Sequence, residues 1–165
     1  MGSPAATQRR GENGLEINKI TGDILDASVK IHKMFGPGML ESVYERLLAV
    51  ELEKRGHKVE RQKSVTFDYE GVRFENAFKV DLMVDGEVVV ELKSSALMHP
   101  VYPKQVRTYL VLTGKSVGLL VNFGMGTLKD GFVRIVNGFT PDTTPNDLRV
   151  SASLRDVDFM KGTNE

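Results

Sequence analysis

Two neighbouring apolar segments, 80–84 and 88–93, have the β-branched composition of strands and are joined by an Asp85-Gly86 turn. An Asp-Gly pair between two such segments is typical of a β-hairpin. The charged residues set into these segments are Asp81, Glu91 and Lys93. Because burying an unpaired charge is costly, carboxylates in such strands usually bind a metal ion or have a charged partner. The chain must therefore fold into a sheet that places a partner beside these charges.

The register of this hairpin decides whether the charges meet. With a tight two-residue turn, Asp81 faces Val90 and Glu91 points to the opposite side of the sheet, because side chains alternate along a strand. With a connection that is one residue longer or bulged, Leu82 pairs with Val90. Asp81 then lies directly across from Glu91, with Cβ atoms about 4.5–5.5 Å apart. We expect this second register, because it separates apolar from charged side chains and lets both carboxylates share one cation.

Composition limits the class of protein. A length of 165 residues with 41% hydrophobic residues is typical of one domain with a single core. Lys plus Arg and Asp plus Glu both number 22, so only a local basic rim is available for nucleic acid. The absence of cysteine excludes disulfides and thiolate metal sites and is compatible with a cytoplasmic location. Since no apolar run approaches the ~20 residues that cross a bilayer, we expect no membrane association.

Periodicity and turn residues divide the chain into helices and strands. Apolar residues recur at spacings of three and four from Leu15 to Met34, which predicts an amphipathic helix that ends at Gly36-Pro37-Gly38. The further elements expected are a helix over 40–55, strands over 58–69, 74–84 and 88–93, a helix over 102–113, a strand over 117–123, a loop over 124–126 and a strand over 132–136. This order predicts an α/β protein with a mixed sheet flanked by helices.

The same reading divides the chain into three regions. These are a poorly ordered N-terminal segment over 1–14, a domain over 15–137 and a polar C-terminal tail over 138–165. The N-terminal segment is rich in polar and small residues and lacks the apolar core of a signal peptide.

Six short segments stand in order at the junctions of the expected elements. They are Gly38-x-x-Glu41-x-x-Tyr44, Val59-Glu60-Arg61-Gln62, Val80-Asp81-Leu82, Glu91-Leu92-Lys93, 105–109 and 119–124. Together they resemble the PD-(D/E)XK nuclease superfamily, and within it the GxxExxY family. No single segment is specific, but six in the right order indicate the fold. The resemblance implies a restriction-endonuclease-like core of order α-β-β-β-α-β, with Val80 in place of the superfamily's proline.

The resemblance also implies roles for the charged residues. Asp81 and Glu91 would bind Mg²⁺ or Mn²⁺ with the Leu92 carbonyl as a third ligand, since hard oxygen donors suit Mg²⁺. Lys93 would orient the attacking water or stabilise the transition state. Glu41, at the start of the second helix, would reach the metal directly or through water. The open alternatives are a cross-strand ion-pair network for the hairpin charges and a favourable helix-dipole interaction for Glu41.

Four further residues are candidates for contact with the substrate. Gln105 and Tyr109 lie four residues apart and so share one face of the third helix, which the resemblance places at the border of the active site. The Gln105 amide would hold a phosphate oxygen or a water as part of the catalytic machinery, and Tyr109 would bind substrate. Tyr44 and Gln62 are the remaining substrate-binding candidates. Packing in the core is the alternative for both tyrosines.

The expected function is a Mg²⁺-dependent nuclease that hydrolyses phosphodiester bonds of DNA. One alternative is a module that keeps the nuclease fold for nucleic-acid binding or protein assembly without turnover, which the zero net charge favours. Another is hydrolysis of RNA or a nucleotide by the same site. A homodimer is expected by analogy with other proteins of this fold.

Overall fold

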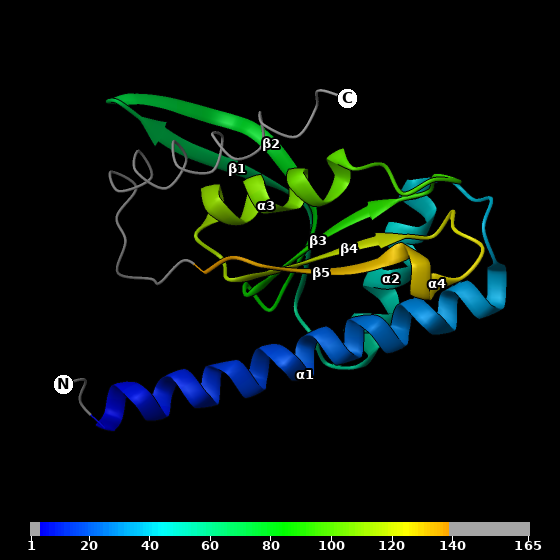
Figure 1. Cartoon of the computed structure of the whole chain (residues 1–165), viewed down its shortest axis with the longest axis horizontal. Helices are drawn as coiled ribbons and strands as arrows, with labels where there is room; N and C mark the ends of the chain where they lie inside the picture. The colour runs from blue at the N-terminus through cyan, green and yellow to red at the C-terminus, as the bar shows by residue number, and fades with distance from the viewer. Residues whose placement is uncertain (1–3, 139–165) are drawn as a thin grey trace, which may run out of the picture.

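The computed structural model of the protein describes residues 4–138, with side chains from residue 11 onward. Its elements are α1 (Pro4–Phe35), α2 (Glu41–Lys54), β1 (Val59–Tyr69), β2 (Val72–Val84), β3 (Val88–Lys93), α3 (Val101–Thr113), β4 (Val117–Asn122), α4 (Leu128–Gly131) and β5 (Phe132–Val136) (Figure 1). The expected order of helices and strands is confirmed, and the short helix α4 is added before the last strand. Gly114 ends α3 in the left-handed conformation that favours glycine.

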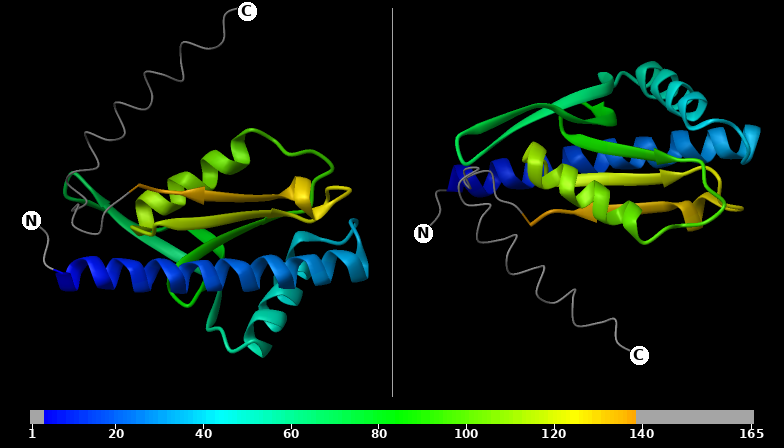
Figure 2. Two further views of the ribbon diagram at one scale, coloured as in Figure 1. Left: turned by 60° about the horizontal axis from the view of Figure 1, so that its bottom comes forward. Right: turned by 90° about the horizontal axis from the view of Figure 1, so that it is seen from above.

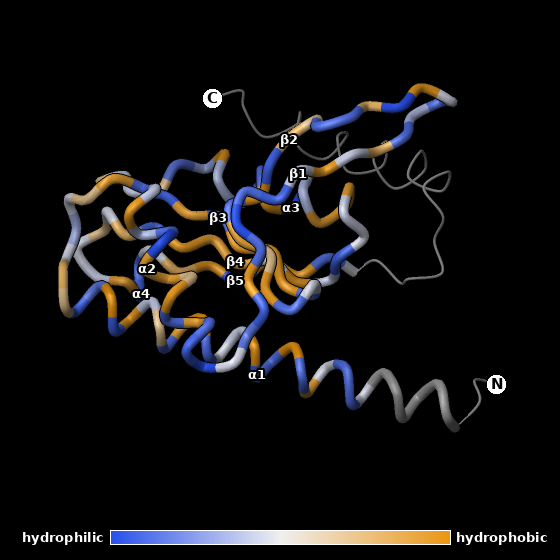
Figure 3. The backbone as a smooth tube through the Cα atoms, turned by 180° about the vertical axis from the view of Figure 1, so that it is seen from behind, coloured by the Kyte–Doolittle hydropathy of each residue, from blue (hydrophilic) through white to orange (hydrophobic). Residues whose placement is uncertain are grey.

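The strands form one mixed sheet in the order β1-β2-β3-β4-β5. β3 and β4 are parallel and are connected through α3, whereas the other neighbours are antiparallel. Every residue of β4, and all but the last of β3, is buried, which is typical of central strands covered on both faces. Figure 3 shows this as a concentration of hydrophobic residues along β3 and β4.

The β2–β3 hairpin has the longer of the two connections considered. Leu82 pairs with Val90 and Val84 with Val88, so three residues separate the strands. Asp85 and Gly86 both have a positive φ, of 52° and 67°. Glycine adopts this conformation freely, and aspartate tolerates it better than most residues. The expected pairing of Leu82 with Val90 is therefore confirmed, but the apolar residues are not confined to one face, since Val80, Met83 and Val89 lie in the core on the other side of the sheet.

Helices cover the two faces of the sheet. α1 and α2 pack on one face and α3 on the other (Figure 2). Ile24 and Leu48 of the first two helices share a core with Val90 of β3. Val106 of α3 packs with Val89 on the opposite side of the same strand. β3 is thus held from both faces, which fixes the strand that carries Glu91 and Lys93.

Helix α1 begins at Pro4, so the expectation of a poorly ordered segment over 1–14 is corrected. The residues between Pro4 and Gly11 are rich in alanine, glutamine and arginine, which have high helix propensity. Such residues extend an existing helix readily, and proline is well tolerated in the first turn. The tail expected over 138–165 lies outside the described residues from 139 onward. None of the described helices is long and apolar enough to cross a membrane.

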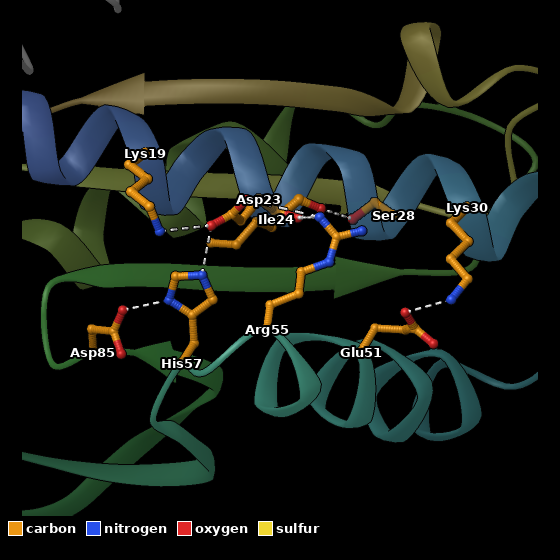
Figure 4. A network of polar contacts seen from close by, with 9 residues as sticks. All are labelled: Lys19, Asp23, Ile24, Ser28, Lys30, Glu51, Arg55, His57 and Asp85. Carbon is orange, nitrogen blue, oxygen red and sulfur yellow. Dashed lines mark hydrogen bonds and ion pairs between the residues drawn. The ribbon is translucent and has the colours of Figure 1, made fainter.

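A buried histidine ties α1 to the sheet (Figure 4). Nε2 of His57 lies 2.9 Å from Oδ2 of Asp23 on α1, and Nδ1 lies 2.6 Å from Oδ2 of Asp85 in the β2–β3 turn. The other oxygen of Asp85 accepts the backbone N–H of Lys58 at 2.8 Å. The hydrogen bond with His57 holds the pKa of Asp23 below its usual value. This contact fixes the hairpin turn relative to the long helix.

Candidate active site

The charged residues of the hairpin meet where β2 and β3 separate. Beyond the pair of Leu82 with Val90, Oδ2 of Asp81 accepts the backbone N–H of Leu92 at 2.8 Å. Asp81 is half-buried, and burial raises the pKa of its carboxyl above the usual value. The aspartate therefore uses a side-chain oxygen to hold β3 at the point where it leaves the regular ladder.

Glu91 is the most buried of these charges. The residue is 4% exposed, and its Oε1 accepts a hydrogen bond from Nζ of Lys93 at 3.0 Å. Its Oε2 is shielded from solvent and has no hydrogen-bond partner among the described residues. Burial, followed by the negative charge of Asp81, raises the pKa of Glu91 to about 7. A carboxylate in this setting needs a cation to become a stable anion.

Glu41 lies in the first turn of α2 and interacts electrostatically with Lys93 and Asp81. The residue itself is exposed, but partial burial of its carboxyl raises the pKa, with Lys93 opposing and Asp81 adding to the increase. The backbone N–H of Ser94 donates a hydrogen bond to Glu41, and the Ser94 hydroxyl donates to the Met39 carbonyl at 2.7 Å. These two bonds place the start of α2 beside the two hairpin carboxylates.

Lys93 provides the positive charge of the cluster. Burial works to lower its pKa, but the hydrogen bond with Glu91 and the charges of Glu91, Glu41 and Asp81 raise it overall. Its Nζ also lies 5.1 Å from the centre of the Tyr102 ring, at cation–π distance. The contacts of Lys93 therefore favour its charged form.

Helix α3 brings Gln105 and Tyr109 to the border of this cluster. Nε2 of Gln105 donates to the Tyr109 hydroxyl at 2.7 Å, so the expected shared face is confirmed. The Tyr109 ring stacks on Phe78 of β2, with centroids 4.2 Å apart. Burial is the main cause of the raised pKa of Tyr109, and the charge of Glu91 adds to it. The tyrosine thus packs against the sheet while its hydroxyl faces the acidic cluster.

Tyr44 is a core residue, which corrects its expected role in substrate binding. The residue is 0% exposed and stacks on Phe123 with ring centroids 4.4 Å apart. Its hydroxyl donates to the Gly36 carbonyl at 2.5 Å and accepts the Met39 N–H at 3.3 Å. A fully buried ring has no surface for a substrate. Tyr44 instead fixes the turn that precedes Glu41.

Gln62 lies at the site as an exposed residue whose side-chain amide contacts two carboxylates. Its Nε2 donates to Oε2 of Glu45 at 2.7 Å and to Oδ1 of Asp81 at 3.0 Å. Glu45 is 4% exposed and was missed from the sequence. The signal for it was its position four residues after Glu41, which places both glutamates on one side of α2.

Asn122 is a second buried polar residue that sequence reasoning missed. Its Oδ1 accepts the backbone N–H groups of Ser95 and Gly124 at 2.9 and 3.1 Å, and its Nδ2 donates to the Leu97 carbonyl at 3.3 Å. A Cβ on Gly124 would lie 2.4 Å from the Ser95 nitrogen, so only glycine fits there. The available signal was an asparagine at the end of a buried apolar strand. Asn122 fixes the loop after Lys93.

The cluster fits a divalent cation held by a pair of carboxylates. Within residues 4–138 there is no group of three or more acidic or histidine side chains placed to ligate a metal jointly. The oxygen of Glu91 that has no partner and the raised pKa of both Asp81 and Glu91 are nevertheless the features that a bound cation would relieve. Mg²⁺ is commonly held by one or two carboxylates together with water and phosphate oxygens.

The family model for the PD-(D/E)XK nuclease superfamily matches residues 18–135 of this chain. The chain belongs to this superfamily. The mixed five-stranded sheet with flanking helices is its restriction-endonuclease-like α/β fold, so the expected fold is confirmed. Membership indicates a nuclease with a nucleic-acid substrate, and PD-(D/E)XK nucleases generally use divalent metals. No curated protein and no solved structure shows significant similarity to the chain.

Proposed function

We propose that this PD-(D/E)XK protein is a Mg²⁺-dependent nuclease that hydrolyses phosphodiester bonds of DNA, with Mn²⁺ as a substitute metal. The observation that carries the proposal is the buried Oε2 of Glu91, which has no partner in the described part of the chain and lies beside the charge of Asp81. The Gly38-x-x-Glu41-x-x-Tyr44 motif supports assignment to the GxxExxY family. A homodimer and a cytoplasmic location remain part of the proposal.

In this mechanism Asp81, Glu91 and the Leu92 carbonyl hold the metal, with Glu41 as an additional ligand. When bound, the metal neutralises charge on the scissile phosphate and favours ionisation of the attacking water. Lys93 places its ammonium beside the same phosphate and stabilises the negative charge that develops during attack.

Helix α3 would bind the phosphate from the side opposite to α2. The Gln105 amide donates one N–H to Tyr109 and has a second N–H to offer to a phosphate oxygen. The Tyr109 hydroxyl accepts from Gln105 and so has its own hydrogen to donate. The second N–H of Gln105 and the O–H of Tyr109 would together orient the phosphate of the substrate.

A cleavage screen tests the proposal. Purified protein is incubated with single- and double-stranded, linear and circular DNA and RNA, each with Mg²⁺, Mn²⁺ or EDTA. We expect cleavage of DNA that depends on metal, is lost in Lys93→Ala and is kept in the control Lys79→Ala, which changes an exposed lysine of β2. Full activity of Lys93→Ala would contradict the mechanism.

Two other results of the screen would each replace part of the proposal. Cleavage of RNA but not DNA would change the substrate. Binding of nucleic acid without cleavage would favour the non-catalytic module, for which the equal numbers of acidic and basic residues are the supporting observation.

A further inference from the structure

Consecutive residues of β1 reach the same carboxylate, which a regular strand does not allow. Nε of Arg61 donates to Oε1 of Glu45 at 2.8 Å, and Nε2 of Gln62 donates to Oε2 of Glu45 at 2.7 Å. Successive side chains of a strand point to opposite faces of the sheet. Two neighbours therefore meet at one side chain only where the strand is distorted.

The distortion is located at Gln62 itself. Its φ is 49°, in the left-handed region that a residue with a Cβ adopts at a cost in free energy. The register pairs Arg61 with Leu82 and Lys63 with Val80, so the strand is regular on both sides of this residue. Strained backbone that persists between regular neighbours is characteristic of functional sites. The cost is balanced by contacts that only this conformation permits.

Those contacts fix the orientation of Asp81. Its Oδ1 accepts from Nε2 of Gln62 at 3.0 Å, and its Oδ2 accepts from the N–H of Leu92 at 2.8 Å. Each carboxylate oxygen has two acceptor positions, so each keeps one for a further partner. Gln62 donates its two amide hydrogens to the carboxylates of Glu45 and Asp81. The amide therefore lies between these two negative charges, where a cation would otherwise be needed.

Glu45 fixes Gln62 in turn. The glutamate is 4% exposed and accepts from Arg61 through its other oxygen, so neither of its oxygens is free to rotate away. We propose that Glu45 and Gln62 are positioning residues that hold the Asp81 carboxylate in the orientation required to bind the metal. This inference rests on the proposed function, because it assigns the two residues to the same metal site.

Replacing Gln62 by glycine separates positioning from folding. Glycine adopts the left-handed conformation freely, so Gln62→Gly relieves the strained backbone while it removes the amide. Because the loss of the hydrogen bonds to Glu45 and Asp81 opposes this relief of strain, we expect the melting temperature of the metal-free protein to change little. Because residues that orient a metal ligand typically contribute 10–100-fold to metal affinity, we expect calorimetry to show Mn²⁺ binding weakened by about that factor.

The pair of strands β1 and β2 contains a matched control position. Asn76 on β2 is also left-handed, with φ 51°, and its side chain bonds Ser64 away from the carboxylates. Asn76→Gly is expected to leave Mn²⁺ affinity unchanged. If Glu45 acts through Gln62, the double variant Glu45→Gln/Gln62→Gly binds Mn²⁺ as weakly as Gln62→Gly alone, whereas additive losses would remove Glu45 from the assignment.

The outcomes distinguish this inference from the proposed function. If the unmodified protein binds Mn²⁺ and folded Gln62→Gly binds it equally well, the positioning role is overturned while the metal site stands. If the unmodified protein binds no Mn²⁺ at all, the proposed function fails and this inference fails with it. A loss of affinity in Gln62→Gly without a loss of thermal stability supports both.

Discussion

Replacing Glu91 by glutamine is expected to stabilise the metal-free protein at alkaline pH, although it removes a proposed metal ligand. Glu91 is 4% exposed, and burial together with the charge of Asp81 raises its pKa from 4.5 to about 7. As the pH rises, the unfolded chain therefore loses this proton before the folded protein does. The contribution of Glu91 to stability is present in full below about pH 4.5 and is lost as the pH rises through about 7.

The difference between the two pKa values sets the size of the effect. It corresponds to about 3 kcal/mol of unfolding free energy, since one pKa unit is worth about 1.4 kcal/mol. Glutamine has the shape of protonated glutamate and does not ionise, so it avoids this loss. Glu91→Gln is expected to be about 3 kcal/mol more stable than the unmodified protein at pH 8, with a smaller gain at pH 5.

Urea unfolding in EDTA, followed by circular dichroism at both pH values, measures this difference. Glu53→Gln, at an exposed position of α2, is the matched control and is expected to show little change at either pH. Added Mg²⁺ is expected to stabilise the unmodified protein but not Glu91→Gln, because a ligand stabilises only the state that binds it. Equal stability of Glu91→Gln and the unmodified protein at pH 8 would show that the pKa of Glu91 is not raised in the folded protein.

Two further predictions concern the contacts that support the site. Gly124→Ala places a methyl group 2.4 Å from the Ser95 nitrogen, so we expect a loss of about 1–3 kcal/mol in calorimetric unfolding, and an unchanged melting temperature would contradict the close approach. His57→Ala removes the ring between Asp23 and Asp85 and is expected to cost about 1–3 kcal/mol in urea unfolding. Because the pKa of Asp23 is lowered in the folded protein, the contribution of Asp23 to the free energy of unfolding is present above its ordinary pKa of 3.8 and is lost as the pH falls below that value. His57→Ala is therefore expected to shift the midpoint of acid unfolding, and an unchanged midpoint would contradict this role of the Asp23–His57 contact.

The hairpin and its charges could be predicted because one physical constraint fixes them. The register that pairs Leu82 with Val90 buries both residues in the core shared with α1 and α2, and it brings Asp81 to the backbone of Leu92 where the strands separate. The spacing of Gln105 and Tyr109 is equally direct, since residues four apart share a helix face. These features depend on local periodicity, which the amino-acid order specifies.

Features that depend on distant residues could not be predicted. Tyr44 was expected near the substrate, but the Phe123 ring that covers it comes from the turn after β4, far along the chain. The left-handed φ of Gln62 follows from contacts with Glu45 and Asp81, not from any preference of glutamine. The early start of α1 reflects helix propensity that acts where hydrophobic periodicity is weak.

The central claim is that Asp81 and Glu91 bind one cation together. Isothermal titration of Mn²⁺ into the metal-free protein, into Asp81→Asn and into the control Asp68→Asn, an exposed aspartate of β1, tests it most directly. We expect one saturable site in the unmodified protein and in Asp68→Asn, and loss of that site in Asp81→Asn. Equal Mn²⁺ binding by Asp81→Asn and the unmodified protein would contradict it.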